Sequence, residues 1–394
     1  MLSQRPNAER EMHQFAFVSG MCGFPWGGSE ELWSQAAVAL HEAGHRVFAS
    51  VHGWPETPLP VKRLRWRGIV VQERRIRQSV GSRLLRRCGS LLGQPGQTVK
   101  ERQMSVFLDI VSPGLACISH GGIACGLEWM ELCALRGIPY VSVCQANGEN
   151  MWPQAAQAER LGRAYIAARA SFFVSEANKE LFEEQIGQRL SNAEVVRDPF
   201  NVPYETDIPW PPSNDGIRLA CVARLDPRAK GQDLLFKVLA TDKWRGRPIA
   251  LSLFGAGPCE GNLKALVQMH ALASKVTFHG HVADVREIWR HHHALILPSR
   301  FEGLPLAIVE AMLCGRPCIV TDVAGNAELL EDNVSGFIAA APTANLVDDA
   351  LERAWNRRNE WPQIAARAQA AVRHAVPPEP ARTFAEKLLQ ITSC

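Results

Sequence analysis

The feature of this sequence that most constrains its fold is an alternation of short apolar runs with amphipathic stretches. The runs in the first half are short and rich in apolar residues, and they lie at residues 14–19, 47–51, 116–119, 139–143 and 172–174. Stretches with helical periodicity, such as 32–43 and 127–135, lie between them. Strands that alternate with helices favour a parallel sheet with helices on both faces. We therefore predict an α/β domain in this half.

The same alternation begins again after a proline-rich break at residues 198–216. Five further strands are expected, at residues 217–222, 249–254, 276–280, 294–297 and 317–321. Two similar domains that face a cleft explain this repeat, and we expect them to cover residues 1–205 and 206–376. The last segment, 377–394, places Phe384, Leu388 and Leu389 on one helical face, which predicts a terminal helix that packs on the preceding structure.

Ligands of open α/β sheets bind outside the carboxyl ends of the strands. The block from Ser299 to Ala311 follows the expected strand at 294–297 and opens a helix, with Glu302 at or before its start and Glu310 about two turns along. The unpaired N–H groups of a helix start suit a phosphate. Two carboxylates beside it suit the hydroxyl groups of a sugar and of a ribose. The plain alternative is a helix cap followed by an exposed helical glutamate.

Two motifs give this block a specific resemblance. The spacing of Glu302 and Glu310, followed by Gly315-Arg316-Pro317, resembles the EX7E motif of retaining glycosyltransferases of family four. Arg224 and Lys230-Gly231 resemble a block at the end of a strand in that family, with Ala223 in place of its usual glycine. The resemblance implies the GT-B fold: two Rossmann-like α/β domains that face each other across a cleft, with a C-terminal helix that crosses back to the first domain.

The resemblance also implies roles for individual residues. Glu302 would bind the hydroxyl groups of the transferred sugar and Glu310 those of the ribose, while Arg224 and Lys230 would neutralise the departing diphosphate. Further donor-binding residues are expected at the helix start, near the base and in the first domain: Gly303, Leu304, Leu306, Ala307, Val282, Gly27 and Gly28. His120 would complete the catalytic set as a histidine that faces the sugar.

The expected activity is transfer of a sugar from a nucleotide diphosphate sugar to an acceptor, with retention at the anomeric carbon. We expect no metal and no cofactor, because the two cations already neutralise the diphosphate. A non-catalytic subunit that binds a sugar nucleotide would need neither Glu302 nor His120. A GT-B epimerase would need no acceptor. The sequence leaves open the sugar, the base (uridine or guanosine), the acceptor and the oligomeric state.

The charge of the chain is concentrated in one segment. The net charge is +3, yet residues 62–102 carry twelve basic residues against two acidic ones. Arg83, Arg86 and Arg87 lie there beside apolar residues at helical spacing. Such a helix is typical of contact with an anionic membrane or with a lipid-linked or other anionic acceptor, and a solvated face over a packed stripe explains it equally well. Nucleic acid is not an expected partner, because no binding module for it is recognisable.

Cysteine usage and hydropathy indicate the compartment. Eleven cysteines are scattered without a CxxC pair, and Cys117, Cys144 and Cys221 lie in apolar runs, which predicts reduced, buried thiols. No apolar run approaches the ~18 residues of a spanning helix. Residues 1–11 are not typical of a secretory signal peptide. We expect a cytoplasmic protein that is peripheral to the inner face of the membrane.

Overall fold

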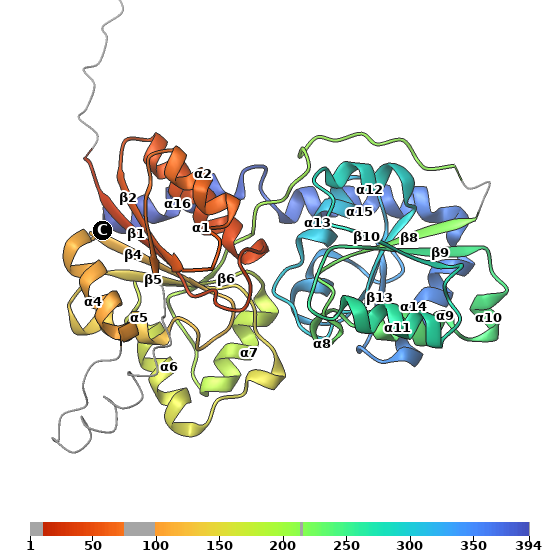
Figure 1. The fold of residues 1–394 in the computed structure, drawn as a ribbon, viewed down its shortest axis with the longest axis horizontal. Coiled ribbons are helices and arrows are strands. Elements are labelled where there is room, and N and C mark those ends of the chain that lie inside the picture. The colour runs from red at the N-terminus through yellow and green to blue at the C-terminus, as the bar shows by residue number, and fades with distance from the viewer. Residues whose placement is uncertain (1–10, 75–98, 213–215, 394) are drawn as a thin grey trace, which may run out of the picture.

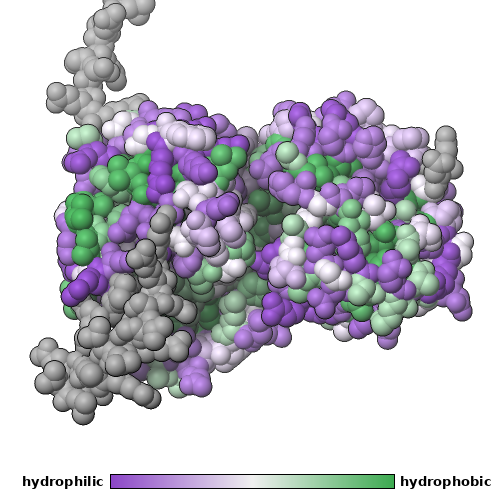
Figure 2. Space-filling view, in the orientation of Figure 1, coloured by the Kyte–Doolittle hydropathy of each residue, from purple (hydrophilic) through white to green (hydrophobic). Residues whose placement is uncertain are grey.

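The computed structural model describes residues 11–74, 99–212 and 216–393. It consists of two α/β domains that lie side by side (Figure 1), and the surface is hollowed between them (Figure 2). Each domain is built on a parallel sheet, as the alternation of strands and helices predicts. The cleft expected between two such domains is therefore present.

The sheet of the first domain has seven strands within the described residues, in the order β3-β2-β1-β4-β5-β6-β7. All its pairings are parallel. The strands are β1 (Gln14–Ser19), β2 (Arg46–His52), β3 (Val70–Arg74), β4 (Leu115–His120), β5 (Tyr140–Cys144), β6 (Ala170–Phe173) and β7 (Ala193–Val195). The expected strands are confirmed, whereas β3 and β7 were not predicted.

Helices cover both faces of this sheet. The helices are α1 (Glu31–Glu42), α2 (Leu59–Trp66), α4 (Val99–Val111), α5 (Leu127–Leu135), α6 (Ala155–Ala167) and α7 (Glu176–Ile186), with short 3-10 turns η1 (Gly28–Glu30) and η3 (Glu149–Met151). Side chains of α1 and α2 pack in one apolar core, and those of α4, α5, α6 and α7 pack in another. The connections place successive strands in parallel, so all their carboxyl ends meet at one edge.

The second sheet is also parallel, with the order β10-β9-β8-β11-β12-β13. Its strands are β8 (Ile217–Val222), β9 (Ile249–Phe254), β10 (Val276–Gly280), β11 (Ala294–Leu297), β12 (Cys318–Thr321) and β13 (Phe337–Ala339). Their side chains share one large core with the surrounding helices. Strand β13 was not predicted.

The second domain has helices of very different length around its sheet. They are α8 (Pro227–Lys230), α9 (Gln232–Leu239), α10 (Asp242–Arg245), α11 (Glu260–Met269), α12 (Val285–His291), α13 (Leu306–Leu313), η4 (Ala324–Leu329), α14 (Ala344–Asn356), η5 (Arg358–Glu360) and α15 (Trp361–Ala375). Helix α13 follows β11 after the loop 298–305, so Glu302 lies in the loop before the helix and Glu310 lies on the helix.

The last helix, α16 (Pro380–Thr392), returns to the first domain and lies beside α1 (Figure 1). Phe384 and Leu388 are buried in the core formed by α1 and the first sheet. The ring of Phe384 meets that of Phe172 edge-on at 5.2 Å, and Lys387 forms an ion pair with Glu194 at 2.5 Å. The predicted crossing of the C-terminal helix is confirmed, so the chain passes twice between the domains.

Candidate functional site

Glu302 and Lys230 come from different loops of the second domain and meet in the cleft. Glu302 follows β11 and Lys230 ends α8, and the Lys230 ammonium lies 2.5 Å from Glu302 Oε1. The Ser299 hydroxyl donates to the same oxygen at 2.7 Å. The Glu302 side chain is 5% exposed and that of Lys230 is 20% exposed. Two of the predicted catalytic residues are therefore a partly buried, charge-paired unit.

The first domain holds the backbone on either side of this carboxylate. Asn147, after β5, forms an antiparallel bridge with Glu302, and Asn178 Nδ2 donates to the Glu302 carbonyl at 3.4 Å. A Cβ at Gly303 would lie 2.0 Å from the Gln145 carbonyl oxygen. Only glycine allows the two domains to approach this closely. Closure of the cleft therefore fixes the loop that carries Glu302.

Arg224 follows β8 and points its guanidinium across the cleft. Its Nη2 lies 3.4 Å from Asp226 Oδ2, and its Nε is buried without a hydrogen-bond partner among the described residues. Its Cζ lies 4.5 Å from the centre of the Phe24 ring, which belongs to the first domain. Arg224 therefore keeps at least one hydrogen-bond donor, its Nε, that no described residue uses.

The start of α13 meets the glycine loop of the first domain. The helix has Pro305 as its N-cap, and its first bond runs from the Ile308 N–H to the Pro305 carbonyl at 3.1 Å. The N–H groups of Leu306 and Ala307 precede this bond and suit an anion. A Cβ at Gly28 would lie 3.2 Å from Leu306 Cδ1, so the loop reaches the helix start.

Glu310 lies on the second turn of α13 and is 3% exposed. Its Oε1 accepts hydrogen bonds from Asn201, from the backbone N–H at 3.0 Å and from Nδ2 at 2.9 Å. Burial raises the pKa of this carboxyl to about 7, and the bonds from Asn201 oppose that shift. Asn201 belongs to the segment between the domains, so the predicted ribose ligand is tied to the interdomain connection.

Leu304 and Val282, two further residues predicted to contact the donor, both pack at the core of the second domain. Leu304, beside Gly303, is 5% exposed and belongs to the core of the second domain. Val282, which follows β10, is half-buried and packs against the same core. Both lie in loops after strands, where ligands of such sheets bind.

His120 is not where a histidine that faces the sugar should be. It ends β4, but its ring is buried inside the first domain, with Nδ1 2.9 Å from the Gly122 carbonyl and Nε2 3.4 Å from the Tyr165 hydroxyl. Burial lowers the pKa of this imidazole to about 4, so it is neutral at pH 7. In this structure the ring faces the interior of the first domain and not the cleft. A direct contact with a sugar stays a prediction that requires this ring to move.

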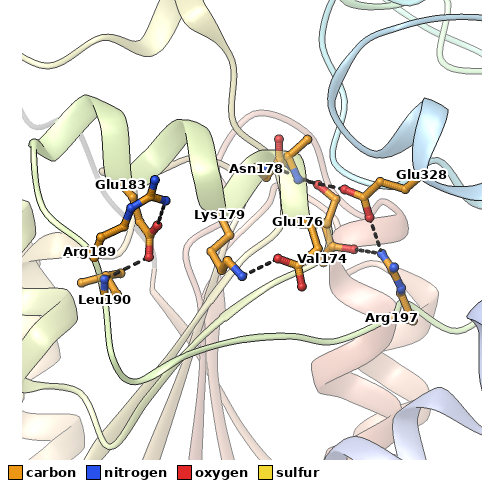
Figure 3. Close-up of polar contacts among 11 residues, drawn as sticks. Val174, Glu176, Asn178, Lys179, Glu183, Arg189, Leu190, Arg197 and Glu328 are labelled. Atoms are coloured by element: carbon orange, nitrogen blue, oxygen red, sulfur yellow. Dashed lines mark hydrogen bonds and ion pairs between the residues drawn. The ribbon is translucent and has the colours of Figure 1, made fainter.

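A second set of contacts between the domains lies beside the site (Figure 3). Glu328, on η4, accepts a hydrogen bond from the Ala177 N–H at the start of α7 at 2.8 Å and pairs with Arg197 at 3.1 Å. Arg197 also donates to the Val174 carbonyl at 2.8 Å. Asn178, which holds the Glu302 carbonyl, is the next residue of α7. Glu328 therefore connects the second domain to the helix that supports the Glu302 loop.

Several residues near the site were not found from the sequence. Glu30, at the end of η1, is 3% exposed, and burial raises the pKa of its carboxyl to about 7 although Ser19 and Arg74 oppose the shift. Arg74 ends β3 and donates to the Ser50 hydroxyl at 2.9 Å. The sequence did contain one indication for Glu30, because this residue directly follows the predicted glycine loop and Ser29. Arg74 and Phe24 had none, because β3 was not predicted and an aromatic residue in a loop points to no ligand.

The remaining predictions concern metals, membranes and the basic segment. Within residues 11–74, 99–212 and 216–393, no group of three or more His, Cys, Asp or Glu side chains could hold a metal ion. In the same residues, every helix is too short or too polar to cross a lipid bilayer. Arg83, Arg86 and Arg87 lie outside the described residues. The absence of a metal in the mechanism stays a prediction.

A comparison with protein families identifies the second domain. Residues 216–357 match the family model described as Glycosyl transferases group 1. These residues form a glycosyl transferases group 1 domain. The match contains Arg224, Lys230, Glu302, Glu310 and Glu328, so the group 1 domain supplies most of the predicted site.

Known proteins with similar sequences match about a third of this chain. A putative glycosyltransferase EpsF of Bacillus subtilis is 35% identical over 108 residues, which are 27% of this chain and 28% of that protein. A GDP-mannose-dependent alpha-(1-6)-phosphatidylinositol monomannoside mannosyltransferase of Mycobacterium tuberculosis is 33% identical over 144 residues, which are 34% of this chain and 37% of that protein. The matches thus span about a third of these relatives.

Solved structures resemble the whole chain. Anabaena Alr3699/HepE in complex with UDP superposes with a TM-score of 0.73 at 16% identity, over 96% of this chain and 99% of that one. Sucrose-phosphate synthase from Thermosynechococcus elongatus superposes with a TM-score of 0.74 at 16% identity, over 96% of this chain and 98% of that one. At such low identity the likeness concerns the fold, which is the predicted GT-B arrangement of two Rossmann-like domains.

Proposed function

We propose that this protein is a retaining glycosyltransferase that takes its sugar from a nucleotide diphosphate sugar. The observation that carries the proposal is the convergence of Glu302, Lys230, Arg224, the start of α13 and the glycine loop in one cleft. The group 1 domain and its resemblance to known glycosyltransferases support it. The spacing of Glu302 and Glu310 supports assignment to family four and, with it, retention.

The two cations and the helix start would bind the diphosphate. Arg224 has a donor that no described residue uses, and Lys230 is a partly buried ammonium beside the cleft. Together with the Leu306 and Ala307 N–H groups and the Gly27–Gly28 loop, they would stabilise the charge that develops as the diphosphate leaves. A preorganised donor of this kind typically contributes a few kcal/mol to the transition state. No side-chain nucleophile is part of this proposal.

The two glutamates would bind hydroxyl groups. Glu302 is fixed by Lys230 and by Ser299, so its second oxygen would accept a hydrogen bond from the transferred sugar. Glu310 Oε1 accepts both hydrogen bonds from Asn201, and Oε2 would accept a hydrogen bond from a ribose hydroxyl group. Val282 would lie against the base. UDP and GDP both fit this scheme, because one relative is a GDP-mannose-dependent mannosyltransferase and the similar structure of HepE is a complex with UDP.

We propose an anionic or lipid-linked acceptor and contact with an anionic membrane. Helix α2 exposes Trp66 (74%) and Leu59 (50%) beside the exposed Lys62 and Arg63. Trp66 and Arg63 line a groove of about 1360 Å³ between α1, α2 and α16. An amphipathic tryptophan flanked by cations is typical of a surface that rests on anionic lipid. Two relatives act, by their names, on a phosphatidylinositol mannoside and on a diphosphoundecaprenol-linked sugar.

The direct test is an assay of sugar release and transfer with UDP-glucose, UDP-galactose, UDP-N-acetylglucosamine and GDP-mannose. We expect one of these donors to be hydrolysed slowly without an acceptor, and Glu302→Gln to lower that rate at least a hundredfold while UDP or GDP binding changes little. Glu159→Gln, on an exposed part of α6, is the matched control and should leave the rate unchanged.

Each alternative function gives a different result in this assay. A binding subunit would bind a donor without consuming it. An epimerase would release an isomerised sugar. Unchanged turnover in Glu302→Gln would remove Glu302 from the catalytic set and contradict the proposal.

A further inference from the structure

We propose that Phe24, in the glycine loop of the first domain, is a positioning residue that orients Arg224 of the second domain for the diphosphate. This inference rests on the proposed function, because it concerns the same donor site. The Arg224 Cζ lies 4.5 Å from the centre of the Phe24 ring, within the range of a cation–π contact. No family motif used above includes an aromatic residue at this position.

The backbone of Arg224 is fixed, whereas hydrogen bonds fix its side chain poorly. The neighbouring Ala223 and Leu225 N–H groups donate to the Phe254 and Ala256 carbonyls at 3.0 and 3.1 Å. Among the described residues, the guanidinium forms one polar contact, at 3.4 Å with Asp226. Asp226 also pairs with Arg228 at 3.3 Å, so its charge is shared. The Phe24 ring is therefore the contact that determines where the guanidinium lies.

The Phe24 ring is itself held firmly by its own loop. A Cβ at Gly27 would lie 2.4 Å from Phe24 Cε2, so the ring packs directly on the Gly27 backbone. The next residue but one, Trp26, donates from its indole N–H to Glu31 Oε1 at 2.7 Å, which ties the loop to the first turn of α1. The loop thus offers a supported aromatic face rather than a free side chain.

Contact through an aromatic face preserves the donors that an anion needs. A phenyl ring accepts no conventional hydrogen bond, so a guanidinium over its face keeps N–H groups that can donate to phosphate oxygens. An acidic partner in the same place would occupy those donors and would repel a diphosphate. Because Phe24 and Arg224 belong to different domains, the complete diphosphate site forms only when the cleft is closed.

The test measures binding of UDP and GDP, and of uridine and guanosine, by calorimetry. We expect Phe24→Ala to weaken binding of the preferred diphosphate about three- to tenfold, the size of a partly exposed cation–π contact, and to leave nucleoside binding unchanged. Phe24→Tyr should restore affinity, and Phe24→Leu should not. Phe48→Ala, which removes another aromatic ring beside an arginine (Arg46, 5.7 Å) away from the cleft, is the matched control.

A double mutant separates positioning from a general defect of the loop. If Phe24 acts through Arg224, Phe24→Ala will have no further effect on diphosphate affinity in an Arg224→Ala background. Three results would overturn the inference while the proposed function stands. They are equal losses of affinity for diphosphate and nucleoside in Phe24→Ala, an undiminished effect of Phe24→Ala in the Arg224→Ala background, and full diphosphate affinity in Phe24→Leu. Failure of the unmutated protein to bind either UDP or GDP would overturn both.

Discussion

Replacement of Glu310 by glutamine should stabilise the protein above neutral pH and weaken nucleotide binding. The carboxyl of Glu310 is 3% exposed, and burial raises its pKa from 4.5 to about 7. Ionisation inside the fold therefore costs free energy that the unfolded chain does not lose. Glutamine keeps an oxygen that accepts both bonds from Asn201 but carries no charge.

The size and the sign of the effect follow from the pKa. The folded state binds the proton more tightly, so the stability that Glu310 contributes is complete below pH 4.5 and is lost as the pH rises to about 7. A pKa shift of this size means that ionisation of Glu310 lowers the free energy of unfolding by about 3 kcal/mol at pH 8 and by about 1 kcal/mol at pH 5. For a domain of this size, each kcal/mol moves the melting temperature by roughly 2–4 °C.

Thermal melts of the unmutated protein and Glu310→Gln between pH 5 and pH 8 would measure this difference. We expect the variant to melt higher, with a gap that widens as the pH rises. Its affinity for UDP or GDP should fall, because glutamine is a weaker acceptor for ribose hydroxyls. A variant that melts lower at pH 8, or a gap that does not depend on pH, would refute the assignment of a buried, ionising carboxylate.

Two more predictions concern the contact between the domains and an exposed surface of the first domain. Glu328→Ala removes the partner of the Ala177 N–H and of Arg197, so it should lower the free energy of unfolding by about 1.5–3 kcal/mol and open the cleft as measured by X-ray scattering. The control Glu176→Ala breaks an exposed ion pair on α7 and should lower the free energy of unfolding by under about 1 kcal/mol. Equal losses in the two variants would contradict the interdomain role of Glu328. Trp66→Ala should reduce sedimentation of the protein with vesicles that contain phosphatidylglycerol, whereas Trp152→Ala, at another exposed tryptophan, should not. If the unmutated protein does not sediment with these vesicles, the proposed membrane contact is wrong.

The fold could be predicted where hydrophobic patterning was strong. The fully buried strand β11 is a continuous apolar run, β1 and β5 are mostly apolar and buried, and the terminal helix showed its buried face through Phe384 and Leu388. Strands β3 and β7 were missed because they lie at the edges of the first sheet and are only partly buried. An edge strand has less need of apolar residues, so its sequence carries a weaker signal.

The site was predictable where one local segment carries the chemistry. Glu302, Glu310, Arg224 and Lys230 belong to short blocks after strands, and the structure brings Glu302 and Lys230 into contact. Contacts between distant segments were not predictable. The contact between Phe24 and Arg224 depends on how the two domains lie together, and the inward position of the His120 ring involves Tyr165, which belongs to a helix further along the chain.

A crystal structure of the protein with UDP or GDP would test the central claim most directly. We predict that diphosphate oxygens lie within ~3.2 Å of the Arg224 guanidinium and the Lys230 ammonium, between the Gly27–Gly28 loop and the start of α13. A nucleotide bound outside the interdomain cleft, or one in the cleft whose diphosphate contacts neither cation, would contradict it.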